Sequence, residues 1–209
     1  MDIMSGIEPS VVFSPFGIPI SNSVISTWVM MAMVIGAVLV LKRRAPGIIE
    51  MLIEFVDNLA GGFISGPTAP YVPFLGSLMV FIATANVIGI VPMMYTPTRD
   101  INTPLALALV VFFAVFAFGI YAKGPWGFVK GFLTPMLPLD LMGYVSRTMS
   151  LTLRLFGNVI GTEIVVAVLF SLMPVGVPLV MVALAAITGL LQGYVFTVLA
   201  SSYISQMVE

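Results

Sequence analysis

The sequence contains no cysteine and no histidine, and only 8% of its 209 residues are charged. Without these residues the chain can form no disulfide, no thiolate metal site, no histidine-ligated haem and no Ser-His-Asp triad. Soluble domains have about 25% charged residues, so this set cannot build a water-exposed globular surface. The groups left for chemistry are carboxylates, arginine, amides and hydroxyls. They suit ion handling better than bond making, and we expect no cofactor and no metal site.

Hydrophobic residues make up 60% of the chain, and the mean hydropathy is +1.15. This composition predicts an all-α integral membrane protein with a single membrane domain over residues 1–209. The net charge is -1 and no basic block occurs, so we expect no nucleic-acid partner. Residues 1–20 lack the basic region of a cleavable signal peptide, and we interpret them as a short amphipathic lead-in.

The hydrophobic pattern predicts about five membrane helices. The first span covers residues 23–41 and ends at Lys42-Arg43-Arg44. The positive-inside rule places this triplet in the cytoplasm and the N-terminus outside. Two further spans cover 72–93 and 104–122, joined by an external loop in which Arg99 and Asp100 are adjacent.

Two long segments, 138–173 and 178–206, predict an antiparallel hairpin that ends in the cytoplasm. Each exceeds the roughly 20 residues that a perpendicular span needs, so we expect both helices to tilt strongly. Between the first two spans, residues 46–60 predict an amphipathic helix at the membrane interface. Glu50, Glu54 and Asp57 share one face of it, which is best interpreted as a solvated acidic face.

Charged residues occur inside the first helix of the hairpin. Asp140, Arg147 and Arg154 follow one another at intervals of seven, which places them on one helix face. Ser150 and Asn158, four residues on either side of Arg154, extend this stripe. Glu163 follows Arg154 by nine residues, so it points to nearly the opposite side.

Each polar position also has a structural interpretation. Asp140 and Arg147 lie near the start of the helix, where long side chains reach the interface. Thr188 and Thr197 are typical of helix packing, and the amides of Asn86 and Gln192 can bond a neighbouring helix. A buried ion pair is the structural alternative for Arg154 and Glu163, but their opposite facing argues against a contact within one helix.

We favour function for Arg154 and Glu163. A charge at the bilayer centre costs about 2.5–3.5 kcal/mol on insertion scales. A buried lysine can lose its proton, whereas an arginine keeps its charge. Arginine therefore suits a site that must never be discharged, such as an electrostatic gate against a moving carboxylate.

Three segments resemble subunit a of F-type ATP synthases: PTRDINTPLALAL (97–109), SRTMSLTLRLFGNVIGTEI (146–164) and LLQGYVFTVLASSYIS (190–205). The resemblance implies a stator subunit whose tilted hairpin lies against a ring of c subunits and is held by the b-subunit peripheral stalk. Two half-channels would carry H+ or Na+ to and from the ring. The absence of a transit peptide favours a bacterial plasma membrane over the membrane of an organelle.

The resemblance also implies roles for single residues. Arg154 matches the family's essential arginine, Glu163 an acidic residue of a half-channel, and Gln192 a glutamine that faces the arginine. Asp140, Arg147, Ser150 and Asn158 match acidic, basic or polar positions of the same helix. The face that carries Leu155 and Asn158 would then lie against a c subunit.

One position departs from the family pattern. Many members have a histidine seven residues before the glutamine, where this chain has Ala185. A titrating histidine relay is therefore excluded, and ions would pass Glu163 by carboxylate, hydroxyl groups or water. Whether the ion is H+ or Na+ stays open.

Two other functions were considered. A secondary transporter would bind an anionic substrate at Arg154, but transporters commonly contain two related halves, and this chain shows no internal repeat. A passive membrane anchor would leave Arg154, Glu163 and Gln192 unexplained. The chain has no Walker-type motif, so the nucleotide chemistry of a synthase would lie on other subunits.

Overall fold

The computed structural model describes residues 11–13, 20–89, 96–132, 137–172 and 176–208, with side chains described over 24–89, 96–126, 142–172, 176 and 179–208. The elements are β1 (Val11–Phe13), β2 (Ile20–Ser21), α1 (Asn22–Arg44), α2 (Pro46–Gly61), α3 (Val72–Ile88), the 3-10 helix η3 (Pro97–Arg99), α4 (Asn102–Phe132), α5 (Leu137–Leu172) and α6 (Val177–Val208).

The prediction of an all-α membrane protein is confirmed. Four described helices are long and apolar enough to cross a membrane: Val24–Arg44, Asn102–Trp126, Met142–Leu172 and Leu179–Val208. Val72–Ile88 is a shorter apolar helix of 17 residues. The two short strands form a small antiparallel ribbon before α1.

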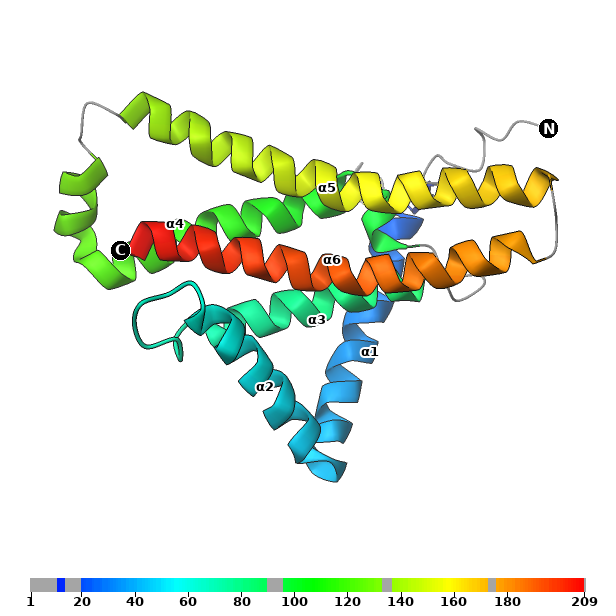
Figure 1. Cartoon of the computed structure of the whole chain (residues 1–209), viewed down its shortest axis with the longest axis horizontal. Helices are drawn as coiled ribbons and strands as arrows, with labels where there is room; N and C mark the ends of the chain where they lie inside the picture. Colours follow the sequence, from blue (N-terminus) through cyan, green and yellow to red (C-terminus); the bar gives the residue numbers. More distant parts are fainter. Residues whose placement is uncertain (1–10, 14–19, 90–95, 133–136, 173–175, 209) are drawn as a thin grey trace.

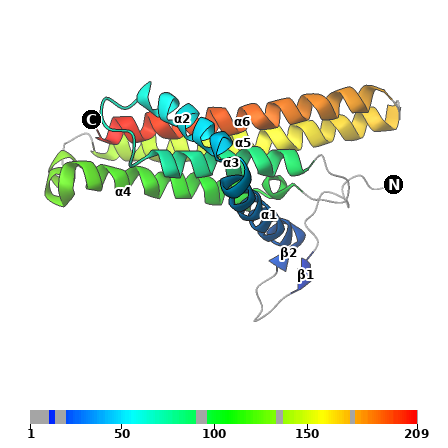
Figure 2. The ribbon, with the colours of Figure 1, turned by 90° about the horizontal axis from the view of Figure 1, so that it is seen from below.

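Helices α3 to α6 lie along roughly one direction, with α5 and α6 side by side and antiparallel (Figure 1). Helices α1 and α2 form a V that projects from this bundle. Figure 2, seen from below, shows α1 leaving the bundle together with β1 and β2. Helices α5 and α6 are inclined to α1 (Figure 1). If α1 crosses the membrane close to perpendicular, the hairpin of α5 and α6 is strongly tilted, as expected.

Helix α6 is the centre of the bundle, because it contacts α2, α3, α4 and α5. Glycines allow its close approach to α3. A Cβ atom on Gly189 would lie 2.8 Å from the Cβ of Asn86, and one on Gly193 would lie 3.1 Å from the carbonyl oxygen of Met79. Small residues at such positions are typical of helix pairs in membranes. The buried core beside them includes Leu75, Ile82, Leu151, Leu155, Phe196 and Ile204.

Helix α4 differs from the expected span at 104–122. It breaks at Gly124, which has φ 72° and ψ 158°, and Pro125 follows. A positive φ favours glycine, and proline removes a backbone donor. After the break the chain changes direction (Figure 1). The expected second span, 72–93, ends as helix at Ile88, and its residues 90–93 lie outside the described residues.

Helix α2 has the amphipathic character that its sequence predicts. Val56 and Ala60 are buried, whereas Glu50, Glu54 and Asp57 are exposed. The Asp57 carboxylate accepts a hydrogen bond from the hydroxyl of Thr68, in the connection to α3.

Candidate functional site

Arg154 lies on the outer surface of α5. Its side chain is exposed, and it makes no hydrogen bond or ion pair with any other residue in the described part of the chain. The core-facing residues of the same helix, Leu151 and Leu155, are 2% and 0% exposed. A charge on the apolar surface of a membrane helix needs a counter-charge, and for Arg154 the described residues do not provide one.

Small side chains surround Arg154 on the exposed face of α5. Ser150 precedes it by one turn, and Gly157 and Gly161 follow it. A Cβ atom on either glycine would meet nothing within 4 Å. Another helix can therefore approach this face closely. The expectation that Leu155 belongs to it is wrong, because one residue is a rotation of about 100° around a helix and turns Leu155 into the core.

Glu163 forms an ion pair with a residue from a distant loop. The Nε atom of Arg99, in η3, lies 3.1 Å from Oε2 of Glu163, and the two side chains are 19% and 35% exposed. Glu163 thus faces away from Arg154, as the helical spacing predicts. Sequence reasoning missed its partner, because the only signal was a charged pair, Arg99-Asp100, in the loop between two spans.

A cavity of about 500 Å³ lies beside this ion pair, between α3, α5 and α6. The polar residues that line it are Asn86, Thr96, Asn158, Thr162 and Glu163. The sequence places Asn158 on the stripe of Arg154, and the structure places it on the cavity wall as well. The cavity therefore extends around the flank of α5 from Glu163 towards the side that carries Arg154.

Asn86 of α3 forms hydrogen bonds with both η3, which contains Arg99, and α6. Its Nδ2 donates to the carbonyl oxygen of Gly189 in α6 (3.2 Å), and its Oδ1 accepts from the hydroxyl of Thr98 in η3 (3.0 Å). The structural interpretation of Asn86, a hydrogen bond to a neighbouring helix, is confirmed. Thr98 is completely buried, so η3 is held firmly against the bundle.

Gln192 is buried in α6, with 8% of the residue exposed. Its Nε2 atom finds no hydrogen-bond partner among the described residues, and no hydrogen bond joins it to Arg154. A buried donor without a partner is costly, so the hydrogen bonding of this amide is incomplete within the described part of the chain. Thr188 and Thr197 instead donate to backbone carbonyls of their own helix, which fits a packing role.

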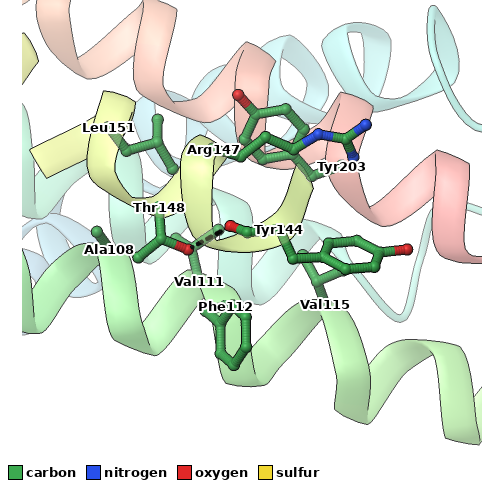
Figure 3. Close-up of a pocket in the computed structure, with 9 residues that line it drawn as sticks. All are labelled: Ala108, Val111, Phe112, Val115, Tyr144, Arg147, Thr148, Leu151 and Tyr203. Atoms are coloured by element: carbon green, nitrogen blue, oxygen red, sulfur yellow. Dashed lines mark hydrogen bonds between the residues drawn. The ribbon is translucent and has the colours of Figure 1, made fainter. Parts of the chain in front are cut away.

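Arg147 differs from Arg154 because it contacts other side chains of the described chain. Its guanidinium carbon lies 5.5 Å from the ring centre of Tyr144 and 5.2 Å from that of Tyr203 in α6. Figure 3 shows Arg147 beside the Tyr203 ring, at a small cavity that also borders α4. These cation–π distances indicate a clamp between α5 and α6. The backbone of Asp140 belongs to α5, and its side chain lies outside the described side chains.

Comparison with known proteins identifies the family. The family model described as "ATP synthase A chain" matches residues 24–205. The chain belongs to this family. It is 35% identical over 201 residues to an ATP synthase subunit a from a Bradyrhizobium species, covering 91% of this chain and 90% of the relative. The ATP synthase subunit a of Moorella thermoacetica is 32% identical over 216 residues, covering 99% of each chain.

A third relative, an ATP synthase subunit a from a Picosynechococcus species, is 36% identical over 198 residues, covering 89% of this chain and 85% of the relative.

Ala185 stands where the resemblance to this family leads us to expect a histidine. Ala185 lines the same cavity as Glu163, so a histidine at this position would have faced that cavity. Here α6 contributes no titratable group at that point.

Proposed function

We propose that this chain is the ion-conducting stator subunit of an F-type ATP synthase, with Arg154 as the gate between two half-channels. Family membership supports the coarser role, a membrane subunit of the Fo sector that takes part in ion transport for ATP synthesis. The finer proposal depends on one observation. Arg154 presents a permanent charge on the outer face of α5 without a counter-charge among the described residues.

The counter-charge that we propose is a carboxylate on a rotating ring of c subunits. Ser150, Gly157 and Gly161 leave room for a ring helix to approach Arg154. A carboxylate that has released its ion would be attracted to the guanidinium and would leave it only to accept an ion from the other half-channel. Because arginine is not discharged, ions could not pass between the half-channels without turning the ring.

The cavity that contains Glu163 is the candidate for one half-channel. Its carboxylate, amide and hydroxyl groups can coordinate a proton-carrying water or a sodium ion. We assign it to the external side, because Arg99 belongs to the loop that the charge distribution places outside. The buried amide of Gln192 would bond the ring or Arg154 during rotation. Asp140 is proposed for the ion path, and Arg147 supports the hairpin through its tyrosine contacts.

The same proposal covers location and partners. We expect a bacterial plasma membrane, with the N-terminus outside and the C-terminus in the cytoplasm, because Lys42-Arg43-Arg44 and Lys123 then lie on the cytoplasmic side. We propose the c ring and the b-subunit stalk as partners. Ion pumping measured with and without sodium would distinguish H+ from Na+ as the transported ion.

Cysteine cross-linking tests which face of α5 meets the ring. Cysteines at Ser150, Gly157 or Gly161 should cross-link to a c subunit in the assembled complex, whereas a cysteine at the fully buried Leu155 should not. Failure across the whole exposed face would overturn the ring contact. It would favour the alternative of a transporter that binds an anion at Arg154. Co-purification with a ring of small two-helix subunits tests the class of the protein independently.

A further inference from the structure

The ion pair between Arg99 and Glu163 gives the proposed half-channel a feature that conduction needs. A channel site must bind its ion well enough to fill and weakly enough to empty. A lone carboxylate in a membrane helix binds a cation tightly, because little water or polar protein competes for it. At Glu163 a second cation is already present, since the Arg99 Nε atom lies 3.1 Å from its Oε2.

We propose that Arg99 is a positioning residue of the ion path that acts as a tethered counter-ion. It competes with the transported ion for Glu163 and so keeps that ion from being trapped. This inference depends on the proposed function, because it assumes that ions pass Glu163. An arriving H+ or Na+ would take the carboxylate from the guanidinium. When the ion moves on towards the ring, Arg99 would pair with Glu163 again.

The described residues around the cavity bring one carboxylate within reach of Arg99, that of Glu163. Among the described residues that line the cavity, Glu163 is the charged one, and α3 and α6 contribute the neutral Asn86 and Ala185. Asp100, next to Arg99, is turned to its own loop, where its Oδ1 accepts hydrogen bonds from the backbone and side-chain amides of Asn102.

Charges on the other helices that contact η3 are remote from it. The described charged side chains of α1 and α4 are Lys42, Arg43, Arg44 and Lys123. All of them lie far along their helices from η3. The 3-10 helix η3 ends at Arg99, shortly before Asn102 begins α4, and Met30 of α1 packs with Ile88 near the end of α3.

The loop is built to hold Arg99 in place. Thr98, the residue before it, is buried and donates to Asn86, which in turn donates to Gly189 of α6. Gly89, at the end of α3, lets Thr96 approach so closely that an added Cβ would fall 1.9 Å from its hydroxyl oxygen. A freely moving arginine would leave the carboxylate for solvent, whereas this anchored one stays at high local concentration beside it.

The test uses the complete Fo sector in liposomes, with passive ion influx driven by a potassium diffusion potential and measured against pH and against Na+ concentration. In Arg99→Gln the half-saturating ion concentration should fall about tenfold, the size expected when a nearby opposite charge is removed. The maximal rate should fall too, because the ion leaves Glu163 more slowly. Arg99→Lys keeps the charge and should behave like the wild type.

Two further variants separate competition from a structural role. In Arg99→Gln combined with Glu163→Gln, the ion dependence should equal that of Glu163→Gln alone, because no carboxylate remains to compete for. Arg99→His places a group that loses its charge near neutral pH. It should follow the wild type in acid and Arg99→Gln in alkali, and it provides the test if Arg99→Gln does not assemble.

The outcomes that overturn the inference are distinct. If Arg99→Gln, or Arg99→His in alkali, conducts with an unchanged half-saturating concentration and only less complex is assembled, the ion pair is structural. An equal shift in Arg99→Lys and Arg99→Gln would also overturn it, since the charge would not be responsible. A wild-type Fo sector that conducts neither ion would overturn the proposed function itself, and this inference with it.

Discussion

Leu155 is completely buried, whereas Arg154, its neighbour in the chain and about 100° away around α5, is exposed. The helix thus packs with one side and leaves its arginine on the other. A charge placed in this way adds nothing to the packing of the chain itself. This exposed position is the observation on which the proposed contact with the c ring depends.

The first prediction concerns this arginine. Arg154→Lys should abolish coupled ATP synthesis while the complex still assembles, because lysine can lose its proton in an apolar site and cannot act as a permanent barrier. ATP synthesis in membrane vesicles measures the loss, and native gel electrophoresis measures assembly. Full ATP-driven ion pumping by the variant would contradict a role as a gate.

The second prediction concerns Glu163. Glu163→Gln should slow ion flow through Fo without preventing assembly, because glutamine keeps the size of the side chain and an oxygen acceptor for Arg99 while it removes the charge that binds the ion. Passive ion influx and the yield of complex are the measurements. If the variant fails to assemble, Glu163 serves as a structural salt bridge and the half-channel role is wrong.

The third prediction tests the close contact of α3 and α6. Gly193→Ala would place a Cβ atom 3.1 Å from the Met79 carbonyl oxygen and 3.2 Å from Ala83, so the backbone of α3 must yield by a few tenths of an ångström. We expect a loss of about 1–3 kcal/mol, seen as a lower midpoint of thermal unfolding of the detergent-solubilised complex. Gly36→Ala in α1, where a Cβ would meet nothing within 4 Å, is the matched control and should not lower the midpoint, since alanine has the higher helix propensity.

The fourth prediction tests the clamp of the hairpin. Tyr203→Leu removes the ring beneath Arg147 and should destabilise the contact of α5 with α6 by about 0.5–2 kcal/mol. Tyr203→Phe keeps the ring and should remain close to the wild type. Thermal unfolding in detergent again provides the measurement. Equal effects of the two substitutions would assign the loss to the hydroxyl group instead of the ring.

Much of the helix pattern follows from the sequence. Long apolar runs bounded by charges, glycine and proline predict where helices begin and end, and α5 and α6 depart from the predicted 138–173 and 178–206 by at most two residues at either end. Prediction failed at Gly124, where the helix breaks and then continues, because hydropathy does not report the sign of a backbone angle.

Helical spacing also determined that Arg154 and Glu163 face apart, since 3.6 residues per turn fixes directions within one helix. It could not supply the partner of Glu163 or the burial of Leu155. Those depend on which loop and which helix pack against α5, and contacts between distant segments leave no periodic signal in the chain. The sequence by itself placed a permanent charge and a carboxylate on opposite sides of a membrane helix. Only the tertiary structure brought Arg99 to the carboxylate and left Arg154 without a described partner, because η3 is anchored to α3 and α6 on one flank of α5 and no described element covers the other.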